Sequence, residues 1–123
     1  MNDSQSELIS SYSRAQALED GVLVDVTNTA KEAGIRLPIA VTRAVWDSCV
    51  AVPKGTSCQD ENGRLWDLVW MLSLAMRRAS GSEVFFTVSF RKGRRNVLTQ
   101  LKCQCHPGDD LAPVLTVMLP NED

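Results

Sequence analysis

The longest apolar stretch of the chain lies near its middle and predicts a buried helix. Ten of the twelve residues from Leu65 to Met76 are apolar, and at about 100° per residue they cover almost the whole circumference of a helix. A helix that is apolar on all sides is either buried or spans a membrane, and a span needs roughly 20 apolar residues. Because Arg77 and Arg78 end the run, we predict a buried central helix over residues 63–79. In the alternative interpretation, an aromatic face of this helix stays partly exposed and binds a partner helix.

After this helix the apolar residues alternate with more polar ones, which is the signature of β-strands. The alternating segments are residues 84–90, 97–105 and 113–119, and the turn sequences RKGRRN and HPGDD separate them. They predict a three-stranded antiparallel meander with one apolar face. A sheet that is apolar on one side needs a cover, so we expect this face to pack on the central helix. The residues of the face are Phe86, Val88, Phe90, Leu101 and Cys103.

Capping signals predict two short helices in the first third of the chain. Ser13 and Gln16 have the spacing of a capping box, and Gly21 can end the helix that follows. Thr29 and Glu32 form a second such pair and predict a helix of one to two turns that stops near residue 34.

Two further segments complete the predicted fold. Residues 39–50 have apolar positions at helical spacing and predict a third helix behind Pro38, which suits a first helical turn. Residues 22–26 are rich in β-branched side chains and predict a short strand or an extended core segment. The fold class is therefore α+β, with three to four helices packed on the three-stranded meander. We expect residues 1–11 to form a flexible tail and residues 12–123 to form a single domain.

Size and charge narrow the functional classes. The chain has 123 residues and a net charge of −2, which suggests one domain and argues against wholesale coating of nucleic acid. The polar, acidic start of the chain does not resemble a signal peptide. With no predicted membrane span either, we expect a cytoplasmic protein without membrane contacts. In that reducing compartment the four cysteines should be free thiols.

The turn between the first two predicted strands carries the most distinctive cluster of charge. Four of the thirteen basic residues fall within five positions there, and two more end the central helix. Together they are candidates for one patch that contacts phosphates or an acidic protein partner. The alternative is a solvated hairpin tip that protects a strand edge from aggregation. These candidate binding residues are Arg91, Lys92, Arg94, Arg95, Arg77 and Arg78.

A second cluster, Cys103, Cys105 and His106, has ligand types that zinc uses. The two cysteines should share one face of a strand, and that face is predicted to be core. Adjacent side chains in a strand point to opposite faces, so Cys105 and His106 are poorly placed as a catalytic pair. No phosphate-binding glycine loop is present. We therefore predict no catalytic residues, no metal site and no cofactor, and we favour a non-enzymatic protein.

The one carboxylate inside the apolar run is Asp67. If the helix is buried on all sides, this group needs a donor, because an unpaired buried charge is strongly unfavourable. Arg14, Arg43 and Arg64 are the candidate partners.

Four stretches together resemble a known family. They are ISSYSRAQALEDGVLVDVT (residues 9–27), LPIAVTRAVWDSCV (37–50), GRLWDLVWML (63–72) and VLTVMLPNED (114–123). The chain is similar over these stretches to small uncharacterised bacterial proteins carried on plasmids, phages and integrative elements. The resemblance implies a mobile-element accessory protein and carries no known reaction. It draws attention to the polar or special positions of the first stretch, which are Tyr12, Arg14, Gln16, Asp20 and Gly21.

The expected function is therefore binding of another macromolecule. We predict a protein-interaction domain with a protein partner whose identity the sequence does not give. The alternative is a nucleic-acid-binding accessory protein that uses the basic turn at residues 91–95.

Overall fold

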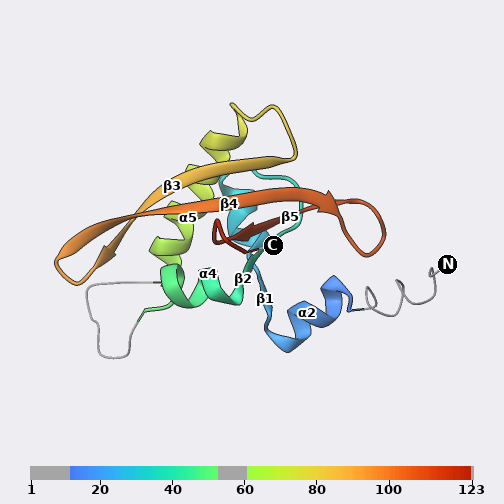
Figure 1. Ribbon diagram of the computed structural model, residues 1–123, viewed down its shortest axis with the longest axis horizontal. Coiled ribbons are helices and arrows are strands. Elements are labelled where there is room, and N and C mark those ends of the chain that lie inside the picture. The colour runs from blue at the N-terminus through green and yellow to red at the C-terminus, as the bar shows by residue number, and fades with distance from the viewer. Residues whose placement is uncertain (1–11, 53–60, 123) are drawn as a thin grey trace.

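The computed structural model describes residues 12–52 and 61–122 and contains one five-stranded mixed sheet (Figure 1). The strand order is β1-β2-β5-β4-β3, and all neighbours are antiparallel except β2 and β5. The predicted three-stranded antiparallel meander is therefore wrong, although β3, β4 and β5 do follow one another as antiparallel neighbours within the larger sheet. The strands are β1 (Leu23–Asp25), β2 (Ile39–Thr42), β3 (Glu83–Lys92), β4 (Arg95–Pro107) and β5 (Pro113–Met118).

The error arises at β2, which the sequence predicted as the start of a helix. Ile39, Ala40 and Val41 are all at most 1% exposed, because β2 lies between β1 and β5 and is covered on both faces. A short apolar run of this kind has the same sequence pattern in a buried strand as in a buried helix. The chain becomes helical only after Thr42, whose hydroxyl accepts a hydrogen bond from Val45 N–H. Two short helical elements then follow, α4 (Arg43–Val45) and η1 (Trp46–Val50).

The first helix follows its predicted caps. In α2 (Arg14–Asp20), Ser13 and Gln16 form the reciprocal capping box, and Gly21 ends the helix with a φ of 79°. Residues 22–26 include β1, so the short strand predicted there is confirmed.

The second helix does not follow its predicted cap. Thr29 lies inside α3 (Thr27–Glu32) rather than at its cap. The carboxylate of Asp25 instead accepts the main-chain N–H of Thr27. Asp25 thus holds the start of α3 against the end of β1.

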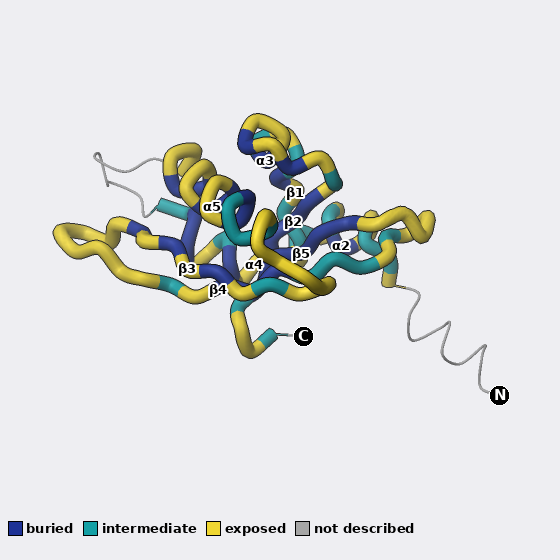
Figure 2. The backbone as a smooth tube through the Cα atoms, turned by 90° about the horizontal axis from the view of Figure 1, so that it is seen from above, coloured by how far each residue is buried: buried dark blue, intermediate teal, exposed yellow. Residues whose placement is uncertain are grey.

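The core forms where α5 (Glu61–Met76) and α3 cover one side of the sheet, opposite to the C-terminal segment (Figure 2). The predicted apolar face of β3 and β4 is confirmed, since its five residues are all at most 6% exposed. From α5, Leu68, Val69 and Leu72 are fully buried against it. Burial of one such side chain stabilises the fold by about 1.5–3 kcal/mol. None of the helices in the described part of the chain is long and apolar enough to cross a membrane.

Candidate functional site at the open edge of the sheet

The strand β3 forms one edge of the sheet, and within the described part of the chain the outward main-chain groups in its middle have no hydrogen-bond partner. Cys105 N–H donates to Ser82 O at 2.7 Å, and hydrogen-bonded pairs alternate along an antiparallel ladder. The main-chain N–H and C=O groups of Ser82 and of every second residue after it therefore point toward β4. Phe85, Thr87 and Ser89 turn theirs outward, and none of the hydrogen bonds found within residues 12–52 and 61–122 reaches these outward groups. The edge can accept another strand.

An apolar groove runs beside this edge, between β3 and the C-terminal half of α5. It encloses a volume of about 460 Å³. Arg78 adds a positive charge to an otherwise apolar or neutral lining. The lining residues are Met71, Leu74, Ala75, Arg78, Ala79, Val84, Phe85, Phe86 and Thr87.

An exposed aromatic ridge on α5 leads toward the groove. Trp66 and Trp70 are 38% and 40% exposed, and their rings stack with centroids 5.9 Å apart. Residues four apart on a helix form one row, so Trp66, Trp70, Leu74 and Arg78 follow one another along the surface. The prediction of a helix buried on all sides is wrong, and the structure has the partly exposed aromatic face of the alternative interpretation. Binding of a partner to that face stays a prediction.

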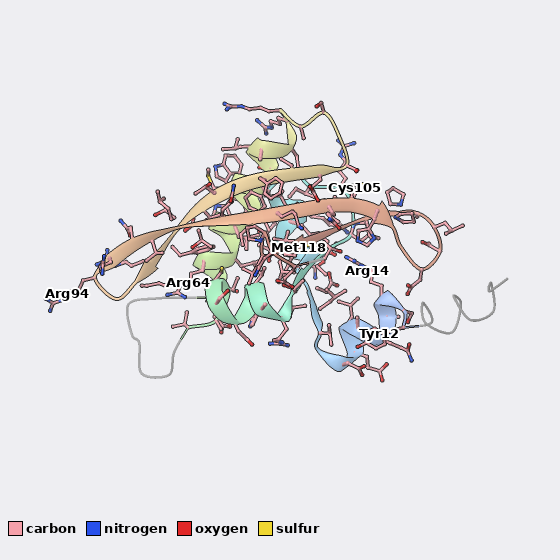
Figure 3. All side chains as sticks on the ribbon, in the orientation of Figure 1. Tyr12, Arg14, Arg64, Arg94, Cys105 and Met118 are labelled. Atoms are coloured by element: carbon pink, nitrogen blue, oxygen red, sulfur yellow. The ribbon has the colours of Figure 1, made fainter. Side chains whose placement is uncertain are left out.

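Arg64 closes one end of the open edge (Figure 3). This arginine is buried, and its guanidinium donates to the carbonyl oxygens of Arg91 at 2.6 Å, Ala51 at 3.1 Å and Cys49 at 3.5 Å. Arg91 belongs to the outward-facing set of β3, so Arg64 occupies the carbonyl that an added strand would need there. The predicted pairing of Asp67 does not arise, since Asp67 is exposed.

The basic turn is the tip of a projecting two-stranded arm (Figure 1). Lys92 faces Arg95 across the hairpin, and Gly93 and Arg94 form its two-residue loop, with Gly93 at a φ of 65°. Of the β4 residues, only 102–107 pair with β5, so among the described residues no third strand lies beside the outer part of the hairpin. All four basic residues of the arm are exposed, and Figure 3 shows Arg94 at its end.

The structure does not bring Arg77 and Arg78 to this tip. Arg64, at the start of α5, contacts Arg91 at the end of β3. Arg78 lines the groove together with Val84 at the start of β3. The helix therefore runs antiparallel to β3, and at 1.5 Å per residue its two ends are about 20 Å apart. The predicted basic residues therefore lie near the two ends of α5 instead of forming one patch.

The cysteine and histidine cluster is divided between the core and a polar surface. Burial, together with the neighbouring Cys105, raises the pKa of the Cys103 thiol to about 12, so this thiol is inert. His106 lies 2.7 Å from Thr116 Oγ1 through Nε2 and 3.0 Å from Pro107 O through Nδ1. Within residues 12–52 and 61–122, no three side chains of the types that bind metals gather in one place. Cys58 lies outside the described residues.

At the opposite end of the sheet, residues of the first family-like stretch form a polar cluster. The guanidinium of Arg14 donates to Thr116 Oγ1 at 2.8 Å and to Leu115 O at 2.7 Å. Partial burial lowers the pKa of Arg14, while the negative charges of Asp25 and Asp109 oppose that shift. Tyr12 donates to Asp20 at 2.9 Å, and this bond raises the pKa of the Tyr12 phenol.

This polar cluster fastens α2 to the sheet. Both carboxylate oxygens of Asp109 accept main-chain N–H groups of α2, from Arg14 at 2.8 Å and Ala15 at 3.0 Å. These two hydrogen bonds lower the pKa of Asp109. Since the polar atoms named here bond to one another, the arrangement is typical of a structural fastening.

Comparison with known proteins identifies the family. A model of DUF6573, described as a family of unknown function, matches residues 1–123. The chain belongs to this family. No curated protein and no solved structure matches this DUF6573 member at a significant level.

In this DUF6573 member, the sequence named Arg64 only as a candidate partner of Asp67. It did not predict the contacts of Arg64 with main-chain carbonyls or the open edge. Arg64, Leu68 and Leu72 are spaced four residues apart and share one face of α5. That spacing could have shown that Arg64 points toward the core. The sequence has no comparable pattern that shows which strand lies at the edge, because this depends on how distant segments of the chain pair.

Proposed function

We propose that the protein is a non-enzymatic interaction domain that binds an extended segment of another protein along β3. The observation that carries the proposal is the open edge of β3 beside a preformed apolar groove. In such strand addition, main-chain hydrogen bonds supply affinity and a neighbouring pocket selects side chains. The stacked tryptophans of the ridge extend the apolar surface on which the partner can lie.

A single added segment fits this edge better than a second copy of the chain. Among the strands of the sheet, β3 is the one on which α5 chiefly packs. Paired strands lie about 4.8 Å apart, whereas packed helices need about 8–10 Å between their axes. Two copies joined through β3 would bring their α5 helices into collision, while an extended segment brings no helix of its own.

The proposed setting is the cytoplasm of a bacterium that carries a mobile element. The resemblance to proteins of plasmids, phages and integrative elements supports an accessory role for the domain, and the partner we propose is a protein of the host or of the element.

Hydrogen exchange on the full chain tests this function. In the free protein, we expect the amides of Phe85, Thr87 and Ser89 to exchange faster than those of Phe86 and Val88. Only the N–H groups of the latter two point toward β4 and donate hydrogen bonds to it. A protein captured from the native host with the tagged chain should slow exchange at the three outward amides at least tenfold.

Two matched variants locate the binding. Leu74→Glu places a charge in the groove and should abolish both capture and protection. Leu98→Glu makes the same kind of change at a side chain that is 74% exposed on β4, and should leave both unchanged. Capture without protection of the outward amides, or equal loss in both variants, would contradict binding at this edge.

A second candidate function, nucleic-acid binding, is favoured by the projecting basic arm. The major groove of DNA admits a two-stranded β-ribbon. Four phosphate contacts predict a slope of about −3.6 for the logarithm of affinity against the logarithm of salt concentration. Replacing Arg94 and Arg95 together by alanine should reduce that slope by about two. The matched double variant of Arg77 and Arg78, at the other end of α5, should bind duplex DNA as the wild type does. Absent or salt-insensitive binding would exclude this function.

A further inference from the structure

We propose that the groove selects an extended acidic–apolar segment of about seven residues that adds antiparallel to β3. The proposal rests on the proposed function and specifies the chemistry of the partner. Three features of the edge define the segment: its usable length, the side chains that line it, and the position of its charge.

The length follows from the two ends of the edge. At one end, the bond from Arg64 to Arg91 O removes the main-chain acceptor that a longer strand would use. At the other end, β3 begins at Glu83. Residues 83–89 remain, and at about 3.3 Å per residue they accommodate an added strand of roughly seven residues.

The side-chain pattern follows from the pleat of the sheet. Side chains directly opposite each other in neighbouring strands lie on the same face. Segment residues opposite Phe86 and Val88 therefore point to the side covered by α5, where Met71 and Leu74 line the groove. These two positions of the segment should be apolar. Its intervening positions point to the other, solvent-exposed face of β3.

The charge preference comes from Arg78, which lines the groove near Val84. The nearest acidic residue of the strand is Glu83, which accepts a hydrogen bond from Gln104 at 2.9 Å. Like the other odd-numbered side chains of β3, that of Glu83 lies on the face opposite α5. The guanidinium of Arg78 therefore meets the segment on the groove side. Antiparallel pairing is the more stable arrangement, and it places the C-terminal part of the segment opposite Val84. An acidic residue belongs there.

The probe is a fluorescent, acetylated peptide of sequence Thr-Val-Thr-Val-Thr-Asp-Thr, titrated with the full-length protein. Its valines lie opposite Val88 and Phe86, and its aspartate lies opposite Val84. We expect binding that weakens about fivefold when the peptide aspartate becomes lysine, which is near the upper range for an exposed ion pair. The variant Arg78→Glu should reverse this preference. Arg77→Glu, on the other flank of the helix, should not.

Two N-methylated peptides test the antiparallel register. The threonine between the two valines lies opposite Thr87, so its N–H points at β3, and N-methylation there should reduce binding at least tenfold. N-methylation of the valine that follows it modifies an N–H that points away, and should leave affinity within about twofold, since no ladder hydrogen bond is lost.

Each outcome bears on a different statement. Equal binding of the aspartate and lysine peptides overturns the acid preference while leaving strand addition intact. Equal effects of the two N-methyl groups overturn the antiparallel register. If none of the peptides binds, the proposed segment is wrong, and hydrogen exchange with a captured partner still decides whether the edge is used.

Discussion

The two edges of the sheet differ in length and in their surroundings. The strand β1 has three residues, and its ladder bonds to β2 run through Val22 O and Val26 N. Only Leu23 and Asp25 therefore direct their main chains outward, and this short strand contacts α2. The strand β3 has ten residues. Its outer side borders an apolar groove, and the side chain of Arg64 covers the carbonyl of Arg91.

This difference shows where the fold leaves room for a partner. An exposed strand edge is a template for pairing, and proteins ordinarily shorten it, charge it or cover it. The β1 edge is short, and its strand contacts α2, which Arg14 and Asp109 fasten to the sheet. The β3 edge carries its charges at its two ends, at Glu83 and at Arg91 and Lys92. Its middle stays open beside apolar side chains, which is the arrangement that strand addition uses.

The largest expected effect comes from Arg64→Ala, which removes the group that ends the open edge. Three carbonyl oxygens lose a charged donor in a buried position, and hydrogen bonds to charged groups contribute about 1.5–3 kcal/mol each before partial compensation. We expect the free energy of unfolding to fall by about 3 kcal/mol, a size typical of a broken buried network. Urea denaturation of the full chain measures it.

Two companion variants sharpen that result. Arg94→Ala removes an exposed arginine from the tip of the same hairpin and should change the free energy of unfolding by less than about 0.5 kcal/mol. Arg64→Lys keeps the charge but loses the planar fork that reaches several carbonyls at once, so it should recover only part of the loss. If the alanine variant were as stable as wild type, Arg64 would not hold the end of the edge.

The sequence predicted most of the local structure and much less of how it is assembled. The alternation in residues 84–105 was sufficient to assign the buried face, because a half-buried strand has a period of two. The capping box at Ser13 was sufficient to place α2. At β2 the pattern was insufficient, since a strand buried on both faces loses its alternation. For this reason the predicted sheet stopped at a three-stranded meander and did not include β2 beside β5.

The candidate site could be predicted only in part. The basic residues of the arm were visible as a charge cluster, but their separation from Arg77 and Arg78 depends on the antiparallel packing of α5 on β3. The apolar run of α5 suggested uniform burial, although the sheet covers only one side of it, so Trp66 and Trp70 remain exposed. The rest of the chain determines which side of the helix is covered, so the periodicity of the helix alone does not predict it.

The smallest expected effect concerns the fastening of α2 to the sheet and depends on pH. The main-chain N–H groups of Arg14 and Ala15 hold the pKa of Asp109 below its ordinary value of 3.8. A carboxyl group whose pKa is lowered by folding stabilises the folded state above its unfolded pKa, and this contribution is lost as the pH falls through the folded pKa. Asp109→Asn should therefore lower Tm by a few degrees at neutral pH, and the difference from wild type should shrink once the pH falls below 3.8.

The control for Asp109 is Glu19→Gln, which neutralises an exposed carboxylate at the other end of α2. Glu19 lies near the negative end of the helix dipole, so its neutralisation should not lower Tm. Thermal unfolding followed by circular dichroism across this pH range separates the two variants. A Tm difference for Asp109→Asn that persists unchanged at acid pH would mean that the amide fails for steric reasons. The fastening of α2 to the sheet would then not depend on the charge of Asp109.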